Sequence, residues 1–268
     1  MGGCVVRGFL SFVVDAFLPR CCLACGREMG LLDSSSWGVE GGASGSRIED
    51  LLAADLAYEL RGGVSLAARL LCDECRAKLE TAHEPGVLTI PGAPEKDVPV
   101  ICPFFTNDQL LGLVRFLKFS GGRSAVPALG WWMARALEDY LGAWADSDPA
   151  EVSLVPVPLH PSRERSRGYN QAFLLAWEVG ERLGFGVESR MLRRIRNTKS
   201  QSTLDPARKA RNLREAFALI RADLAFGRKI IVVDDLVTTG ETAAACVAAL
   251  EPALPASIAV LAAGRVRD

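Results

Sequence analysis

The chain has 268 residues and a formal net charge of −1; 49% of its residues are hydrophobic and 24% are charged. This ordinary globular balance leaves room for one large domain, or for a domain with a small module, and it excludes a partner attracted by global charge. The chain has eight cysteines, four of them in CxxC pairs, and its length argues against a small secreted disulfide framework.

The first predicted element is the apolar run at residues 4–18. Arg7 and Asp15 interrupt it, and no small-residue cleavage site precedes Pro19. The run is also shorter than the roughly 20 apolar residues that cross a bilayer. We therefore predict a short amphipathic helix that packs on the protein rather than a targeting segment, with no membrane span. A cytoplasmic location follows as the default.

Two CxxC pairs come next, and each can present two thiolates to one metal ion. Gly26 permits the tight turn that such a zinc knuckle uses. Buried or redox-active cysteines are the alternative, and Cys21 is an alternative ligand beside its neighbour. The four predicted ligands of a tetrahedral, structural Cys4 zinc site are Cys22, Cys25, Cys72 and Cys75.

The zinc module is predicted to occupy residues 1–95, with a flexible insertion at about 30–70. Residues 34–46 are rich in serine and glycine, and leucines recur near helical spacing over 48–71. The Pro/Gly-rich stretch 86–99 predicts a linker. The second predicted domain therefore covers residues 96–268.

The second domain alternates helical and strand patterns. Strands that alternate with helices indicate an α/β fold, with a parallel sheet flanked by helices. Apolar spacing predicts helices at 110–117, 131–140, 170–183 and 242–250, and apolar runs predict strands at 152–157, 230–233 and 258–263.

A basic segment follows the strand predicted at 152–157. Several cationic donors near exposed backbone amides suit a diphosphate, although an exposed basic turn is the alternative. A loop histidine such as His160 is more often a bystander than a base. Three prolines stiffen the exit from the strand and three arginines follow them: Pro156, Pro158, Pro161, Arg163, Arg165 and Arg167.

A second basic segment, residues 190–214, holds nine basic side chains and one acid. A mobile cationic flap between two strands could close over a bound diphosphate and exclude water. A nucleic-acid surface and a solvated charged helix are the alternatives. The absence of any aromatic residue in this segment counts against single-stranded DNA binding.

The strand predicted at 230–233 runs into Asp234 and Asp235, and a small hydroxylated loop precedes the next helix. Ligands bind outside the carboxyl ends of parallel strands, where two carboxylates suit the hydroxyl donors of a sugar. The loop amides, the threonine hydroxyls and the positive end of the helix suit a phosphate. An acidic turn before a capped helix is the alternative, but the whole string is more specific.

Four segments in this order resemble the ComF family of competence-associated proteins, which includes the GntX-like group: LKFSG (117–121), RGYNQA (167–172), KSQSTLDPARKARNLREAF (199–217) and VVDDLVTTG (232–240). The resemblance implies a type I phosphoribosyltransferase fold and binding of phosphoribosyl pyrophosphate (PRPP) with Mg²⁺. It further implies a link to DNA uptake in natural transformation, with single-stranded DNA and a helicase-like competence protein as partners.

The resemblance also implies roles for individual residues. Asp234 and Asp235 would hold the ribose hydroxyls as the catalytic pair. The expected reaction is Mg²⁺-dependent transfer of phosphoribose to a nitrogen acceptor that no residue specifies. A non-catalytic ribose-phosphate or DNA-binding module, or a scaffold for the helicase, is the alternative. The implied 5′-phosphate loop is Val237, Thr238, Thr239, Gly240, Glu241 and Thr242; the pyrophosphate loop is Pro158, Leu159, His160, Arg165 and Arg167; and the flexible loop holds Arg194, Lys199 and Gln201.

Overall fold

The computed structural model describes residues 21–29, 70–90, 93–119, 122–142, 148–196 and 215–267, and the statements below concern these residues. The predictions for residues 4–18, for 30–69 and for 197–214, which include Lys199 and Gln201, fall outside them.

A seven-stranded sheet forms the centre of the fold, and its strands follow the order β1-β2-β9-β8-β4-β5, with β3 also paired to β9. Only the pairing of β1 with β2 is antiparallel; the other pairs of this described sheet are parallel. The predicted α/β class with a mostly parallel sheet is therefore confirmed. The strands are β1 (Gly86–Ile90), β2 (Ala93–Ile101), β3 (Phe104–Phe105), β4 (Val152–Pro156), β5 (Gly186–Val187), β8 (Lys229–Val237) and β9 (Ser257–Arg265).

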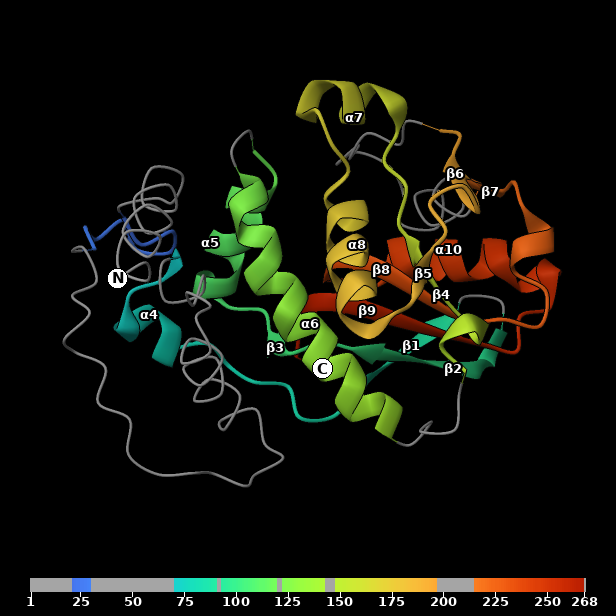
Figure 1. The fold of residues 1–268 in the computed structure, drawn as a ribbon, viewed down its shortest axis with the longest axis horizontal. Helices are drawn as coiled ribbons and strands as arrows, with labels where there is room; N and C mark the ends of the chain where they lie inside the picture. Colours follow the sequence, from blue (N-terminus) through green and yellow to red (C-terminus); the bar gives the residue numbers. More distant parts are fainter. Residues whose placement is uncertain are drawn as a thin grey trace, which may run out of the picture.

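Helices cover both faces of the sheet (Figure 1). Side chains of β4, β8 and β9 alternate between two apolar clusters, as a strand buried on both faces requires. Leu154, Ile231 and Leu261 pack on the side of α5, α6 and α8, whereas Val155, Val232 and Val260 pack on the side of α10. The helices are α5 (Asp108–Leu117), α6 (Val126–Leu141), α8 (Gln171–Leu183) and α10 (Glu241–Leu250).

These helices agree with the predicted ones, although α6 begins earlier than expected, at Val126. Smaller elements complete the described fold, and none of its helices has the length and apolar character needed to cross a membrane. The smaller elements are α4 (Asp73–Ala77), α7 (Pro161–Arg167), a two-stranded antiparallel sheet of β6 (Leu192–Arg194) and β7 (Phe217–Leu219), and the 3-10 turns η1 (Gly122–Ala125), η3 (Pro149–Glu151), η4 (Ala222–Leu224) and η5 (Glu251–Ala253).

The prediction of a linker at residues 86–99 is wrong, because this stretch lies in the β1–β2 pair. Burial alternates along β1, with Val87 exposed and Leu88 and Ile90 buried. This period-two pattern places one face on the core, and it outweighs the turn-forming glycines and prolines. A domain boundary between residues 95 and 96 would fall inside β2, so the division into two domains stays a proposal.

The cysteine-bearing segment shares its core with the sheet. Cys22, Leu70 and Cys75 belong to the same buried cluster as Leu110 and Leu113 of α5. The contact is close at Gly112, where an added Cβ would lie 2.9 Å from the Cα of Ala24 and from the carbonyl oxygen of Leu23. The first knuckle therefore rests directly on the α5 backbone.

Candidate functional site

The phosphate loop lies at the carboxyl end of β8. The strand continues through both aspartates to Val237, so the prediction that it stops at Asp234 is wrong. Pairing with β9 explains the extension, because the ladder still joins Asp234 to Ala262 and Val237 to Arg265. The acids are therefore fixed in extended backbone, and the turn begins only after them.

Gly240 shapes the turn between β8 and α10. Its φ is +71°, a left-handed conformation that side chains disfavour, and an added Cβ would lie 2.4 Å from Cδ1 of Leu88 on β1. The first amides of a helix lack intrahelical partners and favour an anion. A hollow of about 30 Å³ is lined by Asp234 and by the residues from Leu236 to Ala243. The predicted phosphate-loop residues are thus brought together at one hollow, which also includes Asp234.

Asp234 is half-buried at this hollow. Its Oδ1 accepts a hydrogen bond of 2.8 Å from the backbone N–H of Asp235. Burial, and next the charge of Asp235, raise the pKa of the Asp234 carboxyl to about 7. Lys118 and Arg194 act in the opposite direction, and Cys246 of α10 lies close enough to feel the same carboxylate.

Asp235 has different surroundings. Its residue is 4% exposed, and it does not line the hollow. The Nζ of Lys118 lies 3.1 Å from Oδ1 of Asp235, whereas Oδ2 is buried with no hydrogen-bond partner among the described residues. Asp234 therefore lines the hollow while Asp235 pairs with Lys118, and the predicted role of the two acids in holding a ribose stays a proposal.

Lys118 was missed among the predicted site residues, although its LKFSG segment belongs to the family resemblance. It follows the last turn of α5, where its amide bonds back to the carbonyls of Val114 and Arg115. Tyr169 secures the segment from the other side, since its hydroxyl oxygen lies 2.6 Å from the carbonyl oxygens of both Leu117 and Phe119, between which its one O–H hydrogen is shared. A cation directly after a buried helix face was the available signal in the sequence.

The segment after β4, which is expected to bind pyrophosphate, is partly helical. Pro161 starts α7, and His160 caps that helix by accepting a 3.3 Å hydrogen bond at Nδ1 from the amide of Ser162. Asn170 donates to the carbonyl of Val157 at 3.0 Å and closes the base of the loop. His160 thus has a structural role in this arrangement.

The predicted arginines of this loop lie on or near the last turn of α7. Arg165 is exposed, and Arg167 is half-buried and donates to the side-chain oxygen of Gln171. Strand β4 lies between β5 and β8. The chain leaves β4 toward β5 on one side and returns to β8 on the other, so the strand order reverses at β4. Ligands of parallel α/β sheets bind at such a reversal, outside the strand ends. The loops after β4 and β8 meet this condition.

Arg194 of β6 reaches the same region from the hood formed by β6 and β7. It is 9% exposed, and its guanidinium lies 5.3 Å from the ring centre of Phe217. Burial, and next the charge of Arg163, lower the pKa of Arg194, while Asp234 opposes that change. The charges of Arg194 and Lys118 therefore both act on Asp234, and that of Arg163 acts on Arg194. The other predicted flap residues, Lys199 and Gln201, lie outside the described residues.

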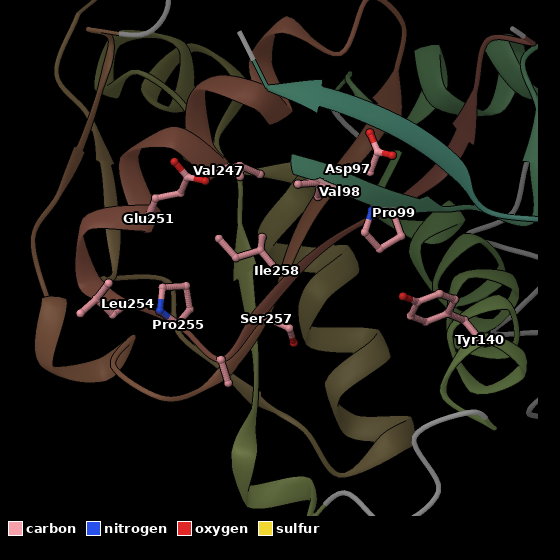
Figure 2. A pocket seen from close by; sticks show the side chains of 11 residues that line it. Asp97, Val98, Pro99, Tyr140, Val247, Glu251, Leu254, Pro255, Ser257 and Ile258 are labelled. Atoms are coloured by element: carbon pink, nitrogen blue, oxygen red, sulfur yellow. The ribbon is translucent and has the colours of Figure 1, made fainter. Parts of the chain in front are cut away.

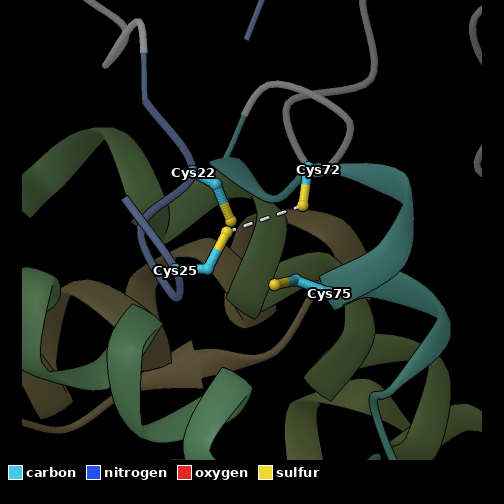
Figure 3. A group of neighbouring side chains, drawn as sticks. All are labelled: Cys22, Cys25, Cys72 and Cys75. Atoms are coloured by element: carbon cyan, nitrogen blue, oxygen red, sulfur yellow. Dashed lines mark hydrogen bonds between the residues drawn. The ribbon is translucent and has the colours of Figure 1, made fainter. Parts of the chain in front are cut away.

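The four predicted metal ligands meet at one point (Figure 3). The sulfur atoms of Cys22, Cys25, Cys72 and Cys75 all lie within 4.8 Å of one another. Those of Cys25 and Cys72 are 3.8 Å apart, close to the spacing of about 3.8 Å between thiolates around tetrahedral zinc. Burial opposes ionisation of Cys22, but amides of Cys72, Cys25 and Ala24 outweigh it and lower its pKa to about 6. The cluster could bind a structural metal such as zinc.

A larger hollow of about 650 Å³ lies at the amino end of β9, whereas the phosphate loop follows the carboxyl end of β8 (Figure 2). Apolar side chains such as Val98 and Ile258 line it together with Tyr140 and the acids Asp97 and Glu251. None of the predicted site residues lines it. It is therefore separate from the phosphate loop, and α10 runs from one region to the other.

Several curated proteins are similar to this chain, whereas no family model matches it. Competence protein F of Haemophilus influenzae is 35% identical over 91 residues, which cover 34% of this chain and 40% of that protein. DNA utilization protein YhgH of Salmonella typhi is 36% identical over 135 residues, 49% of this chain and 56% of that protein. Competence protein ComFC of Bacillus subtilis is 38% identical over 137 residues, 51% of both chains.

The chain thus spans between two fifths and just over half of the length of these relatives. Among solved structures, TT1426 from Thermus thermophilus superposes with a TM-score of 0.31 at 18% identity, over 53% of this chain and 83% of that one. That superposition is too weak to assign the fold.

Proposed function

The chain is related to the ComF family, as its motifs predicted, and from this premise we propose that it binds PRPP or a related ribose phosphate. The proposal includes a type I phosphoribosyltransferase fold for the α/β domain. It also includes a part in DNA uptake during natural transformation, because the relatives are named competence and DNA utilization proteins.

One observation carries the proposal: a carboxylate and a phosphate-type loop share one hollow at the mouth of a buried strand. Asp234 and the turn through Thr242 line that hollow. Gly240 keeps the turn tight against Leu88, which leaves the loop amides and the start of α10 to hold a 5′-phosphate. Asp234 is placed to accept a hydrogen bond from a ribose hydroxyl.

The proposed reaction is transfer of phosphoribose to a nitrogen acceptor with loss of pyrophosphate. Bond cleavage leaves negative charge on the departing diphosphate, and fixed cations stabilise that charge. Arg194 is an arginine whose charge acts on Asp234, and Arg163, Arg165 and Arg167 lie on α7. Asp234 would hold the ribose in position, which lowers the entropic part of the barrier.

Mg²⁺ belongs to the same proposal as the ion that PRPP brings with it. Mg²⁺ prefers oxygen ligands and retains several waters, so one protein carboxylate with substrate oxygens suffices. Asp234 and Glu241 are the carboxylates that line the hollow, and we assign this role to Asp234. The ion would neutralise diphosphate charge. Zinc in the Cys4 cluster and a cytoplasmic location complete the proposal.

A non-catalytic role is the second candidate, and the names of the relatives favour a link to DNA. The ribose-phosphate site would then sense a ligand or contact single-stranded DNA, or the cysteine module would dock a helicase-like partner. Titration with single-stranded DNA at several salt concentrations tests the DNA version. Phosphate contacts predict a steep loss of affinity with salt, and no binding at low salt contradicts it.

The primary test compares Gly240→Ala with Gly227→Ala in calorimetric titrations of PRPP with Mg²⁺. Both glycines have positive φ, +71° and +68°, but only Gly240 has a neighbour in the space of a Cβ. We expect Gly240→Ala to lose about tenfold or more in PRPP affinity, and Gly227→Ala to bind like the wild type. Equal affinities in the two variants, or no binding by the wild type, would reject the site.

Catalysis is tested separately by pyrophosphate release. The wild type is incubated with PRPP, Mg²⁺ and a panel of nucleobases and amines, and release above the acceptor-free rate identifies the acceptor. PRPP binding without acceptor-dependent release favours the non-catalytic candidate.

A further inference from the structure

We propose that Lys118 binds the diphosphate end of the ligand and that Asp235 is a positioning residue, which acts by holding Lys118. This inference rests on the proposed binding of PRPP and assigns one cation and one acid within that site. It gives Asp235 a different task from Asp234, although the two are adjacent in the sequence.

Asp235 is buried against Lys118 and away from the hollow. The carboxylate is withdrawn from the hollow and buried, and the Nζ of Lys118 at 3.1 Å is its partner. A buried carboxylate with one oxygen unpaired depends on that cation for compensation. A ribose hydroxyl could reach Asp235 only if the side chains that bury this carboxylate moved aside, whereas Asp234 already lines the hollow.

The placement of Lys118 carries the second step. One third of its side chain is exposed, so the ion pair with Asp235 does not remove Lys118 from solvent. An ammonium has three N–H donors, and the described structure shows a single acceptor for them, Oδ1 of Asp235. Its partner Asp235 directly follows Asp234 in β8, and Asp234 lines the hollow. Donors remain for an anion at that point.

Tyr169 supplies the third step, because it ties Lys118 to the loop expected to bind pyrophosphate. Its hydroxyl bonds the carbonyls on both sides of Lys118, and the guanidinium of Arg123 lies 4.9 Å from the centre of its ring. The end of α5, the loop after β4 and β8 thus converge on one lysine. A ribose phosphate held by the loop after β8 would direct its diphosphate toward this junction.

The test compares the affinities of PRPP and ribose 5-phosphate, measured by calorimetry with Mg²⁺. Their ratio reports the diphosphate contacts, since both ligands share the sugar and the 5′-phosphate. We expect Lys118→Met to lower the ratio about tenfold or more, because it removes charge-assisted hydrogen bonds to the diphosphate. Its affinity for ribose 5-phosphate should change less than about twofold. Lys229→Met is the matched control, since Lys229 forms a 3.3 Å ion pair with Glu151 at the other end of β8.

Two further variants guard against misfolding and test the task of Asp235. The double variant Lys118→Met/Asp235→Asn removes both charges, leaves no unpaired buried ion, and should lower the ratio as much as Lys118→Met. Asp235→Asn alone should keep the affinity for ribose 5-phosphate, whereas Asp234→Asn should lose it about tenfold.

An unchanged ratio in Lys118→Met and in the double variant would overturn the assignment of Lys118. Loss of ribose 5-phosphate affinity in Asp235→Asn to the extent seen in Asp234→Asn would overturn the positioning role. Both results leave the proposed function intact. If the wild type binds neither ligand, the proposed function fails together with this inference.

Discussion

The pKa of the Asp234 carboxyl depends on its burial and on its charged neighbours. Burial and the charge of Asp235 raise this pKa to about 7, whereas the pKa of an aspartate in an unfolded chain is about 3.9. Between these two values the folded protein binds a proton at this residue and the unfolded protein does not. Stability contributed by this group therefore falls as the pH rises from about 4 to about 7.

Asp234→Asn removes that dependence. We expect the free energy of unfolding of the variant to exceed that of the wild type at pH 8 by about 1–3 kcal/mol, a value reduced from the full shift because the carboxyl is only half-buried. The difference should shrink toward pH 4. Urea unfolding at pH 4, 6 and 8 measures this difference. If the difference between the two free energies of unfolding is the same at all three pH values, the Asp234 carboxyl titrates normally.

At the scale of elements, α5 joins two parts of the molecule through two different faces. Gly112 touches the backbone of the first knuckle, and Leu110, Leu113 and Leu117 fill the core beneath. A glycine in a helix normally costs about 1 kcal/mol relative to alanine, so it is retained here by contact.

Gly112→Ala should destabilise the protein by about 1–2 kcal/mol, because the backbone contacts at 2.9 Å outweigh the gain in helix propensity. Gly142→Ala at the end of α6 is the control, since open space surrounds its Cβ position. Urea unfolding of both variants gives the comparison. A Gly112→Ala protein as stable as the control would show that the knuckle shifts away without cost.

The elements also mark what could be predicted from the sequence. The run Ile230–Val233 and the helical spacing of Leu110, Val114 and Leu117 predicted β8 and α5, because burial on these elements follows a local period. The β1–β2 pair was missed, since its glycines and prolines suggested a linker while its alternation was short. Local composition competes with tertiary pairing there, and pairing prevails.

The candidate site shows the same limit. Asp234, the loop of Thr238 to Gly240 and the four cysteines were predicted, because motif and spacing identify them. The partnership of Lys118 with Asp235 was not, because it joins segments far apart in the chain and is set by how α5 ends. The role of Tyr169 as a clamp depends on the same packing.

At the scale of the whole molecule, the cysteine cluster belongs to the main core. Cys22 and Cys75 are buried together with residues of α5, α6 and β9. Metal binding to such a cluster contributes directly to folding free energy. We expect about one zinc ion per chain in the reduced protein and a Tm that falls by several degrees on chelation.

Cys72→Ser should lower both the zinc content and the Tm, whereas Cys21→Ser should leave them unchanged, because Cys21 is exposed and outside the cluster. Elemental analysis and thermal unfolding provide the two measurements. Reduced wild-type protein without bound metal would end the assignment of a metal site.

The contact between Gly112 and the first knuckle has one more consequence. Lys118 follows six residues later, about 9 Å along the same helix axis. One short helix therefore connects the first knuckle to the Lys118 ammonium. Removing a metal ion from the thiolates would weaken the packing of the knuckle on Gly112. If the cluster holds zinc and the site binds PRPP as proposed, chelation should lower the selectivity for PRPP over ribose 5-phosphate at temperatures below the Tm.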